Sequence, residues 1–485
     1  MKKTFLINLL LLLMINIIIK PVWLLGIDRG VQNLVGPESY GLYYALFNLT
    51  FIFSIFADVG LTNYNNRNIA QHHFLLKKYL PDVLALKIIL SGLFAIIVII
   101  AGLIMGYSGL SFQLLLWLAL NQAINSFILF FRSNISGLQK FKTDSLLSSL
   151  DKLLMIIILA PVLYGGLEVD LTIKTFVLLQ TVSLSLTATI AFAVVIFYSG
   201  TISFKPSLTR MKSILKSAYP FALLIVLMMI YTRLDTVMLE RMLPDGAIES
   251  GYYAMGYRLL DASSMIAYLF ATLLLPMFAT MLKKKKSPAP LAGISFSLLF
   301  GGSVVLASLC FFQREQIFTL LYPGTTEYAN NLFGLLMMVF VFTSTNYVFG
   351  TLLTANGSLK KLNRVAIIGV FINVILNFIL IPEYKAEGAV WATIFTQGFT
   401  AMAQLIICKK EFNFTPKILK VLAFIGFLTL TPIGMWMIKT AGHFNHIQEL
   451  LLQITLGLAL VFGLKIIPLG KGISFLRSMG GQKRF

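Results

Sequence analysis

The stretch Lys20–Arg67 reads KPVWLLGIDRGVQNLVGPESYGLYYALFNLTFIFSIFADVGLTNYNNR, and it decides the fold of the chain. It predicts an apolar helix, a tight loop at Gly36–Gly41, a second apolar helix and then a polar break that begins at Asp58. Lys20 and Arg29 interrupt the first apolar helix. A charged side chain near the centre of a bilayer costs at least about 2.5–3.5 kcal/mol. A chain that places such groups there is expected to handle an oppositely charged cargo.

The composition is that of a membrane protein. Of the 485 residues, 58% are hydrophobic and only 12% are charged, and the mean hydropathy is +0.86. A water-soluble domain needs far more charge on its surface. Apolar runs of about 20 residues have the length of a helix that crosses a hydrocarbon core about 30 Å thick. We therefore expect an all-α polytopic membrane protein.

The apolar runs predict about fourteen transmembrane helices. Their approximate ranges are 5–28, 40–64, 80–106, 111–131, 147–166, 172–198, 217–240, 252–281, 289–312, 329–354, 363–382, 386–408, 417–439 and 448–467. Met1-Lys2-Lys3 before the first run resembles the start of a signal peptide. No small-residue cleavage site follows it, so we interpret this run as a retained first span.

Basic residues are concentrated in alternate connections between the predicted helices. One set carries clusters such as Lys283 to Lys286, whereas the other set carries mainly acids such as Glu383 and Glu387. Because Lys and Arg near span ends mark the cytoplasmic side, both termini are expected in the cytoplasm. This topology accounts for the net charge of +20, so nucleic acid is not needed as a partner to explain it.

Two sequence echoes predict an internal repeat. Gly41-Leu42-Tyr43-Tyr44-Ala45 is echoed by Gly251-Tyr252-Tyr253-Ala254, and Gly137-Leu138-Gln139-Lys140 by Gly357-Ser358-Leu359-Lys360. Both pairs are offset by about 210–220 residues and keep the same side of the membrane, which is typical of transporters with parallel repeats. We expect two six-helix lobes related by a pseudo-twofold axis, followed by two extra helices. The predicted divisions are 1–200 for the N-terminal lobe, 201–410 for the C-terminal lobe and 411–485 for the last two helices and tail.

Charged residues within the predicted helices form two groups by depth. The group nearer the periplasm comprises Lys20, Arg29, Arg233, Asp235, Arg258 and Asp261. The group nearer the cytoplasm comprises Asp58, Lys87, Arg132, Asp151 and Lys152. Cations outnumber acids and come from both predicted lobes. A cavity lined in this way favours an anion, because positive potential is concentrated in a medium of low dielectric constant.

Several of these charges have a simpler structural explanation. Four cations are close enough to span ends to extend to the membrane surface, namely Arg29, Lys87, Arg132 and Lys152. Arg258 and Asp261 are three residues apart on one helix and can neutralise each other. Arg233 and Asp235 are two residues apart and do not face each other, so at least one needs a partner elsewhere. Lys20, deep in its helix, is the hardest to explain by structure alone.

The intramembrane acids raise the question of a driving ion. Asp58, Asp235 and Asp261 are candidate carriers of a proton or a sodium ion, because buried carboxylates titrate or bind cations. A structural role is the alternative for each of them. Cys310 and Cys408 lie in different helices, and the histidines have no cysteine or acid at metal-ligand spacing. The sequence therefore predicts no disulfide, metal site or other cofactor.

Several motifs resemble those of the bacterial polysaccharide flippases, the O-antigen and capsule repeat-unit translocases of the multidrug/oligosaccharidyl-lipid/polysaccharide (MOP) exporter superfamily. The matching segments are Gly36-Pro37-x-x-Tyr40-Gly41-x-Tyr43, Asp58-x-Gly60-Leu61, Gln139-Lys140, and Asn373…Asn377 with Gly388-Ala389-Val390-x-Ala392-Thr393. The resemblance extends from the first predicted helix to about the twelfth. It implies a V-shaped, two-lobed transporter of the bacterial inner membrane, not an enzyme. Its implied activity is to move an undecaprenyl-pyrophosphate-linked oligosaccharide from the cytoplasmic to the periplasmic leaflet by alternating access.

The resemblance also implies which residues meet the substrate. In such families, basic residues on helices 1, 7 and 8 line the cavity, and Lys20, Arg233 and Arg258 are the residues that match here. Many relatives place an arginine near the first loop, and Arg29 is its counterpart. Lys20 departs from the arginine-only pattern of the first helix. The implied partners are the lipid-linked oligosaccharide and membrane lipids, with the protein acting as a monomer driven by H⁺ or Na⁺.

Two other functions fit the hydropathy. A multidrug antiporter of the same superfamily exports cations, so its cavity is expected to favour acids over bases. A membrane glycan polymerase or ligase needs a sizeable periplasmic loop that holds catalytic Arg or His. The longest candidate for such a loop, near Gln313–Tyr328, is short. The excess of intramembrane cations and the short loops favour the flippase.

Overall fold

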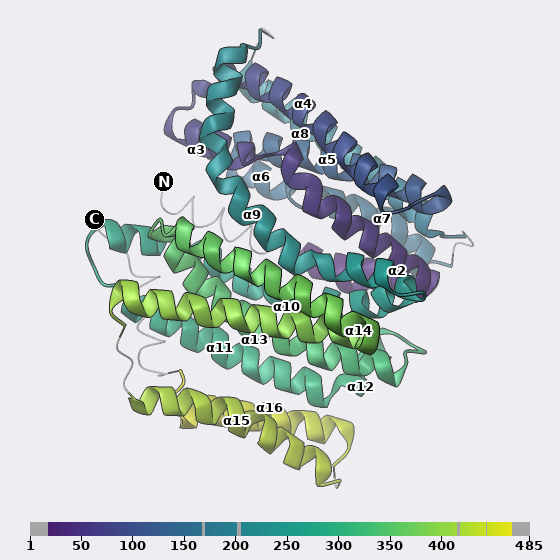
Figure 1. Cartoon of the computed structure of the whole chain (residues 1–485), viewed down its shortest axis with the longest axis vertical. Coiled ribbons are helices and arrows are strands. Elements are labelled where there is room, and N and C mark those ends of the chain that lie inside the picture. Colours follow the sequence, from purple (N-terminus) through teal and green to yellow (C-terminus); the bar gives the residue numbers. More distant parts are fainter. Residues whose placement is uncertain (1–17, 167–169, 201–204, 415–417, 443, 468–485) are drawn as a thin grey trace. The chain divides into compact units, whose positions relative to one another are not determined.

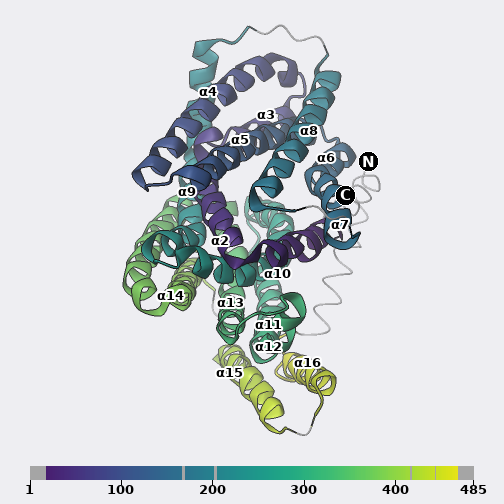
Figure 2. The same ribbon diagram turned by 90° about the vertical axis from the view of Figure 1, so that its right-hand side faces the viewer.

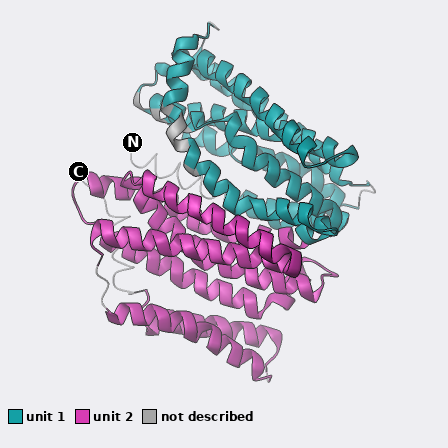
Figure 3. Cartoon of the chain, in the orientation of Figure 1, with its two compact units in different colours: residues 1–251 teal, residues 252–485 magenta. Residues whose placement is uncertain are grey.

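The computed structural model describes residues 18–166, 170–200, 205–414, 418–442 and 444–467, and every regular element in these ranges is helical (Figure 1). The first seventeen residues, which contain most of the predicted first span, and the basic C-terminal tail lie outside the described residues. Two compact units divide the chain at Gly251, within helix α10 (Figure 3). The predicted boundary between residues 200 and 201 separates the two sequence repeats, whereas the boundary at Gly251 separates two compact units. The repeat boundary therefore stays a prediction.

Residues up to Gly251 form the first unit. Its elements are the π-helix η1 (Val22–Asp28), α2 (Arg29–Phe53), the 3₁₀ helix η2 (Ser54–Ala57), α3 (Leu61–Gln71), α4 (Leu75–Ile104), α5 (Gly109–Gly137), α6 (Phe141–Leu147), α7 (Leu150–Tyr164), α8 (Ile173–Ser199) and α9 (Leu208–Met242). The first turn of α10 (Gly246–Lys283) completes it.

The rest of α10 begins the second unit. The other elements of this unit are α11 (Ala289–Phe312), α12 (Arg314–Leu321), α13 (Glu327–Ala355), α14 (Leu359–Phe412), α15 (Ile418–Thr440) and α16 (His446–Gly463). Within it, α13 packs between α11 and α14, and α15 and α16 form a pair that packs on α11 (Figure 2). A small core joins the pair to α11 and α13, made by Val304, Ala307, Val341, Phe427, Val461 and Ile466.

Eleven helical segments among the described residues are long and apolar enough to cross a membrane. Two of them contain a sharp break. Residues 18–57 break at Gly36, whose φ of 77° only glycine adopts freely, and α14 breaks at Lys385, with φ of 52°. The break at Lys385 lies where the sequence predicts a connection. The predicted loop at Gly36–Gly41 is wrong, because Pro37 already starts the next helical segment, a position that suits proline.

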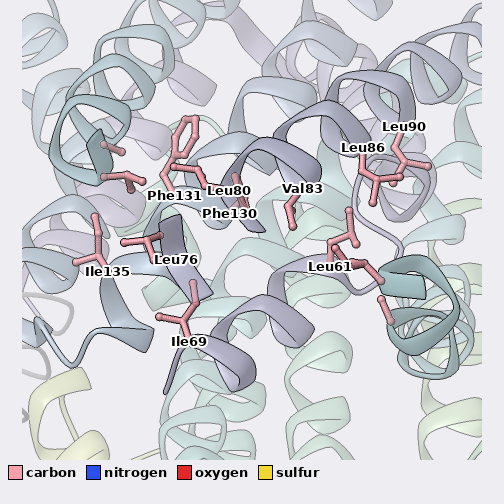
Figure 4. Packing of buried hydrophobic residues seen from close by; sticks show 14 of the residues in the cluster. Leu61, Ile69, Leu76, Leu80, Val83, Leu86, Leu90, Phe130, Phe131 and Ile135 are labelled. Carbon is pink, nitrogen blue, oxygen red and sulfur yellow. The ribbon is translucent and has the colours of Figure 1, made fainter. Parts of the chain in front are cut away.

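The core of the first unit lies between α3, α4, α5 and the helices beside them. Leu61, Leu76, Leu86 and Phe131 are among its buried side chains, and Figure 4 shows the helices from which they come. The chain enters this core through a second break, where Val59 and Gly60 both have positive φ. The motif at 58–61 therefore turns the chain from η2 into α3.

The two echoed glycines meet at a close helix crossing within the first unit. A methyl group on Gly41 would overlap the carbonyl oxygen of Ala247, and one on Gly251 would overlap that of Pro37. Each glycine thus faces the carbonyl group of the residue four positions before the other glycine. Only glycine permits this mutual approach of α2 and α10.

Candidate functional site

The candidate substrate-binding residues are distributed over both units, and each is described within its own unit. Lys20, Arg29 and Arg233 belong to the first unit and Arg258 to the second. All four side chains are partly buried. The structure itself does not test whether they bind a substrate, so these assignments remain predictions.

Lys20 lies in the helical turn just before η1. The charges of Arg132, Lys152 and Asp151 act on it, and the Lys152 ammonium lies 5.2 Å from the centre of the Trp23 ring. Lys20 therefore belongs to the same group as Arg132 and Lys152. The predicted separation of the charges into two groups by depth in the membrane stays a prediction.

Arg29 begins α2, directly after the π-helical turn. Its Nε is buried and has no hydrogen-bond partner among the described residues. A buried donor without a partner is costly, and a guanidinium is costlier still, unless a ligand or water accepts its hydrogen bond. The extension of Arg29 to the membrane surface, expected from the sequence, does not account for this burial.

Asp28 is a buried acid that the sequence analysis missed. Its carboxylate is 1% exposed and accepts hydrogen bonds from the Tyr40 hydroxyl at 3.0 Å (Oδ1) and 2.9 Å (Oδ2), and from Gln32 Nε2 at 3.3 Å. The Tyr40 contact bridges the break at Gly36, so it fixes the angle between the two parts of α2. The signal was present, since any acid in a predicted span needs partners.

Arg233 and Asp235 lie on α9, which packs along α2. Arg233 Nη1 donates to the Tyr44 hydroxyl at 3.3 Å, and the guanidinium lies 5.7 Å from the centre of the Phe51 ring. Asp235 is 1% exposed. The expectation that these two side chains do not face each other, because residues two apart on a helix point different ways, stays a prediction.

Asp58 and Lys87 form an ion pair inside the first unit. Lys87 Nζ lies 2.6 Å from Asp58 Oδ1, and it also donates to Ser126 Oγ and to the Ala57 carbonyl oxygen. Lys87 is 0% exposed, so the prediction that it extends to the membrane surface is wrong. Asp58 also accepts hydrogen bonds from Thr62 Oγ1 and Thr62 N. The pair stabilises the turn between η2 and α3.

Two other cations pair with nearby acids. Arg132 Nε lies 2.8 Å from Asp144 Oδ1, and Lys152 Nζ lies 2.9 Å from Asp151 Oδ2. Neighbouring acids, rather than the membrane surface alone, therefore account for Arg132 and Lys152. Arg132 and Lys152 neutralise the two acids Asp144 and Asp151, so the positive charge of Lys20 remains in excess.

In the second unit, Arg258 and Asp261 are half-buried on α10. Amides join the neighbouring helices: Asn346 of α13 donates to Gln397 Oε1 at 2.8 Å and to Thr400 Oγ1 at 3.0 Å on α14. Amide side chains commonly join packed helices in this way within membranes. Among the described residues, no group of three His, Cys, Asp or Glu side chains could hold a metal ion.

The sequence profile of one protein family matches residues 5–282, more than half of the chain, and the family is described as "Polysaccharide biosynthesis protein". The chain belongs to the polysaccharide biosynthesis protein family. This confirms the family that the motifs of the N-terminal half predict. Among curated protein sequences, none matches the chain.

Solved structures show the fold of this family member. The lipid II flippase MurJ in an inward closed conformation is similar over 95% of this chain and 100% of that chain, with a TM-score of 0.72 and 15% identity. An outward-facing multidrug resistance MATE transporter of the MOP superfamily is similar over 85% and 96%, with a TM-score of 0.57 and 16% identity. A MOP superfamily transporter from Pyrococcus furiosus is similar over 85% of this chain and 96% of that chain, with a TM-score of 0.59 and 16% identity.

The family and the fold together confirm the coarser predictions. The family member is a multi-pass, all-α membrane protein of the MurJ/MATE fold, with eleven helical segments among the described residues that are long and apolar enough to cross a membrane. At these identities the structural likeness concerns the fold alone. The substrate and its binding residues need a separate argument.

Proposed function

We propose that the protein is a flippase that moves an oligosaccharide linked to polyprenyl pyrophosphate, such as undecaprenyl pyrophosphate, from the cytoplasmic to the periplasmic leaflet. The family works in polysaccharide biosynthesis, and MurJ, which has the same fold, is a flippase for lipid II. The sugars would pass through an aqueous space while the polyprenyl chain stays in the membrane. Alternating access between two lobes would expose the site to each side in turn.

The observation that carries the proposal is the environment of two partly buried cations of the first unit. Arg29 has a buried Nε without a partner, and Lys20 lies in the electrostatic field of Arg132 and Lys152. A pyrophosphate would supply the missing acceptors and offset the repulsion between the cations. Arg233 and Arg258 would add to the same site in our proposal, as the family resemblance implies.

The finer topology is part of the proposal. Two of the eleven candidate spans are each broken into two segments, which gives thirteen segments. With α9 added, the count is the fourteen transmembrane segments of our proposal. The charge bias would place both termini in the cytoplasm and the protein in the bacterial inner membrane, as a monomer. The lobes would comprise residues 1–200 and 201–410, with 411–485 as an addition.

A cation gradient is the proposed source of energy. Asp58, Asp235 and Asp261 are the candidate carriers of H⁺ or Na⁺, and the buried Asp28 joins them. Each charge that crosses the membrane is worth about 2.3 kcal/mol per 100 mV. For Asp58 to serve in this way, its ion pair with Lys87 must open during the cycle.

The alternative of a multidrug antiporter shares the fold. In the transporter from Pyrococcus furiosus, the binding pocket is described as having reverse polarity, with a different function suggested. Among the charged residues singled out within the predicted helices, cations outnumber acids, and this excess supports an anionic cargo. The flippase is therefore the function that these residues favour.

The test is translocation of lipid-linked oligosaccharide in a strain that lacks the gene and carries a variant of it. Lys20→Ala, Arg29→Ala, Arg233→Ala and Arg258→Ala should each lower the appearance of glycan on the periplasmic side, at normal protein levels. Lys20→Arg should retain activity, because it keeps the charge. The exposed Lys78 provides the matched control Lys78→Ala, which should have no effect. Full activity in all four site variants would overturn the proposed site.

A further inference from the structure

A pocket of about 510 Å³ lies in the second unit, and none of the candidate substrate-binding residues lines it. Four helices contribute to it: α11, α13, α14 and α15. Its floor is aromatic, since the Phe296 ring lies 5.3 Å from that of Phe349 and 5.2 Å from that of Phe424. Met402 and Leu405 add aliphatic surface. The pocket therefore suits hydrocarbon chains.

Small residues on α11 create the space. Ala289, Ala292 and Gly293 line the pocket, and a side-chain carbon added at Gly293 would meet no atom within 4 Å. An aromatic or aliphatic residue at these positions would fill the pocket from α11. The space is thus a consequence of the sequence of one helix face.

The polar lining of the pocket is cationic. Lys409, near the end of α14, and Lys420, near the start of α15, line it and are both exposed. The Lys420 ammonium lies 5.7 Å from the centre of the Phe424 ring. The nearby acid Glu411 is already paired with Lys361 at 2.7 Å. No acidic residue lines the pocket.

Two further features place this positive charge at the membrane surface. Ala289 begins the 24-residue helix α11, and the N-terminus of a helix carries partial positive charge. The same helix ends belong to the basic connections that the charge bias assigns to the cytoplasm. The cytoplasmic leaflet is rich in anionic lipid, which attracts basic residues near the surface.

We propose that this pocket binds an anionic glycerophospholipid of the cytoplasmic leaflet. Its phosphate would lie between Lys409 and Lys420, and an acyl chain would occupy the space beside Phe296, Phe349 and Gly293. A lysine near an anionic surface contributes roughly a fivefold gain in binding, so the two together contribute about thirtyfold. None of the residues of the proposed glycan site lines this pocket.

The experiment measures lipid binding to the full chain purified in detergent, by native mass spectrometry. Phosphatidylglycerol is compared with phosphatidylcholine of the same acyl chains and with undecaprenyl phosphate. Phosphatidylglycerol should bind in preference to phosphatidylcholine. Lys409→Gln/Lys420→Gln should weaken phosphatidylglycerol binding about thirtyfold. Gly293→Leu, which fills the pocket without a backbone clash, should weaken the binding of both phospholipids.

The matched control is Lys283→Gln/Lys284→Gln, which removes two exposed lysines from a basic segment outside the pocket. It should leave the binding of phosphatidylglycerol unchanged. An equal loss in the control would show attraction to basic surface in general and overturn the site. Unchanged binding in Gly293→Leu would also overturn it. Tight binding of undecaprenyl phosphate without binding of phosphatidylglycerol would assign the pocket to a polyprenyl lipid and overturn the proposed occupant.

Discussion

The buried ion pair between Asp58 and Lys87 gives the sharpest test of the structure. Lys87 is 0% exposed, whereas the Asp58 side chain is 23% exposed and keeps two hydrogen bonds from Thr62 when Lys87 is removed. Breaking a buried pair by removing one partner costs about 3–5 kcal/mol. The two single substitutions should therefore differ, because they leave behind charges in different surroundings.

Asp58→Asn leaves a fully buried ammonium and should cost about 4 kcal/mol of unfolding free energy. Lys87→Met leaves a partly solvated carboxylate and should cost about 2 kcal/mol. With about 2 °C per kcal/mol for a unit of this size, the unfolding temperatures should fall by about 8 °C and 4 °C. The double variant removes both charges, so it should lose less than Asp58→Asn alone.

The assay is the unfolding temperature of detergent-purified protein, followed by tryptophan fluorescence at one fixed heating rate, because unfolding of such proteins is often irreversible. Ser207→Ala serves as a control for the effect of mutation elsewhere in the unit. Ser207 contacts Asp82 through its backbone amide and not through its side chain, so the substitution keeps this contact. A larger loss for Lys87→Met than for Asp58→Asn would refute the assignment of burial. Additive losses in the double variant would refute the pairing.

Three other substitutions test different contacts. Gly41→Ala should prevent normal folding, because its methyl group would overlap the Ala247 carbonyl oxygen. Gly92→Ala is the control and should be tolerated, because there is open space at this position. The yield of protein in the membrane and its monodispersity after purification distinguish the two variants. Asp82→Asn should lower the unfolding temperature more than Arg210→Gln, because Asp82 is fully buried and holds both Arg210, at 2.6 Å and 3.1 Å, and Ser207 N at 2.7 Å. Tyr107→Phe should cost about 1–2 kcal/mol, since the hydroxyl donates to Glu240 at 2.7 Å. Burial raises the pKa of Tyr107 above its ordinary value, so the phenol stays protonated in the folded protein. In the unfolded chain the phenol ionises above about pH 10. The difference in unfolding free energy between the native chain and Tyr107→Phe should therefore shrink above this pH.

The sequence predicted most helices well, because runs of apolar residues carry strong local information. The connection near Lys385 and the ends of α15 and α16 agree with the expected ranges to within a few residues. The start of α9 does not, since the structure begins it at Leu208 instead of residue 217. Arg210 and the lysines after it resemble a loop in sequence. Asp82, which lies far away along the chain, forms an ion pair with Arg210. This pair allows the segment to continue as helix.

The electrostatic environment of single residues was harder to predict for the same reason. Lys87 looked like an interfacial lysine because its partner, Asp58, lies on another element. Asp28 was overlooked because its partner Tyr40 lies beyond the Gly36 break. Depth along one helix could not show that Lys20 lies near Arg132 and Lys152. Local patterns predict helices, but the pairing of charges depends on which helices pack together.

The position of α9 has a mechanical consequence for the proposed lobes. The repeat assigns α9 to the second lobe, yet contacts at both of its ends attach it to the first unit. Arg210 binds Asp82 near the predicted cytoplasmic end, and at the other end Arg241 stacks on Tyr107, 3.8 Å from the ring centre, and donates to the Met105 carbonyl oxygen. A rocking motion that carried α9 with the second lobe would have to break contacts at both ends. A motion that kept these contacts would instead have to be absorbed after α9, within residues 243–251, which include the close crossing at Gly251.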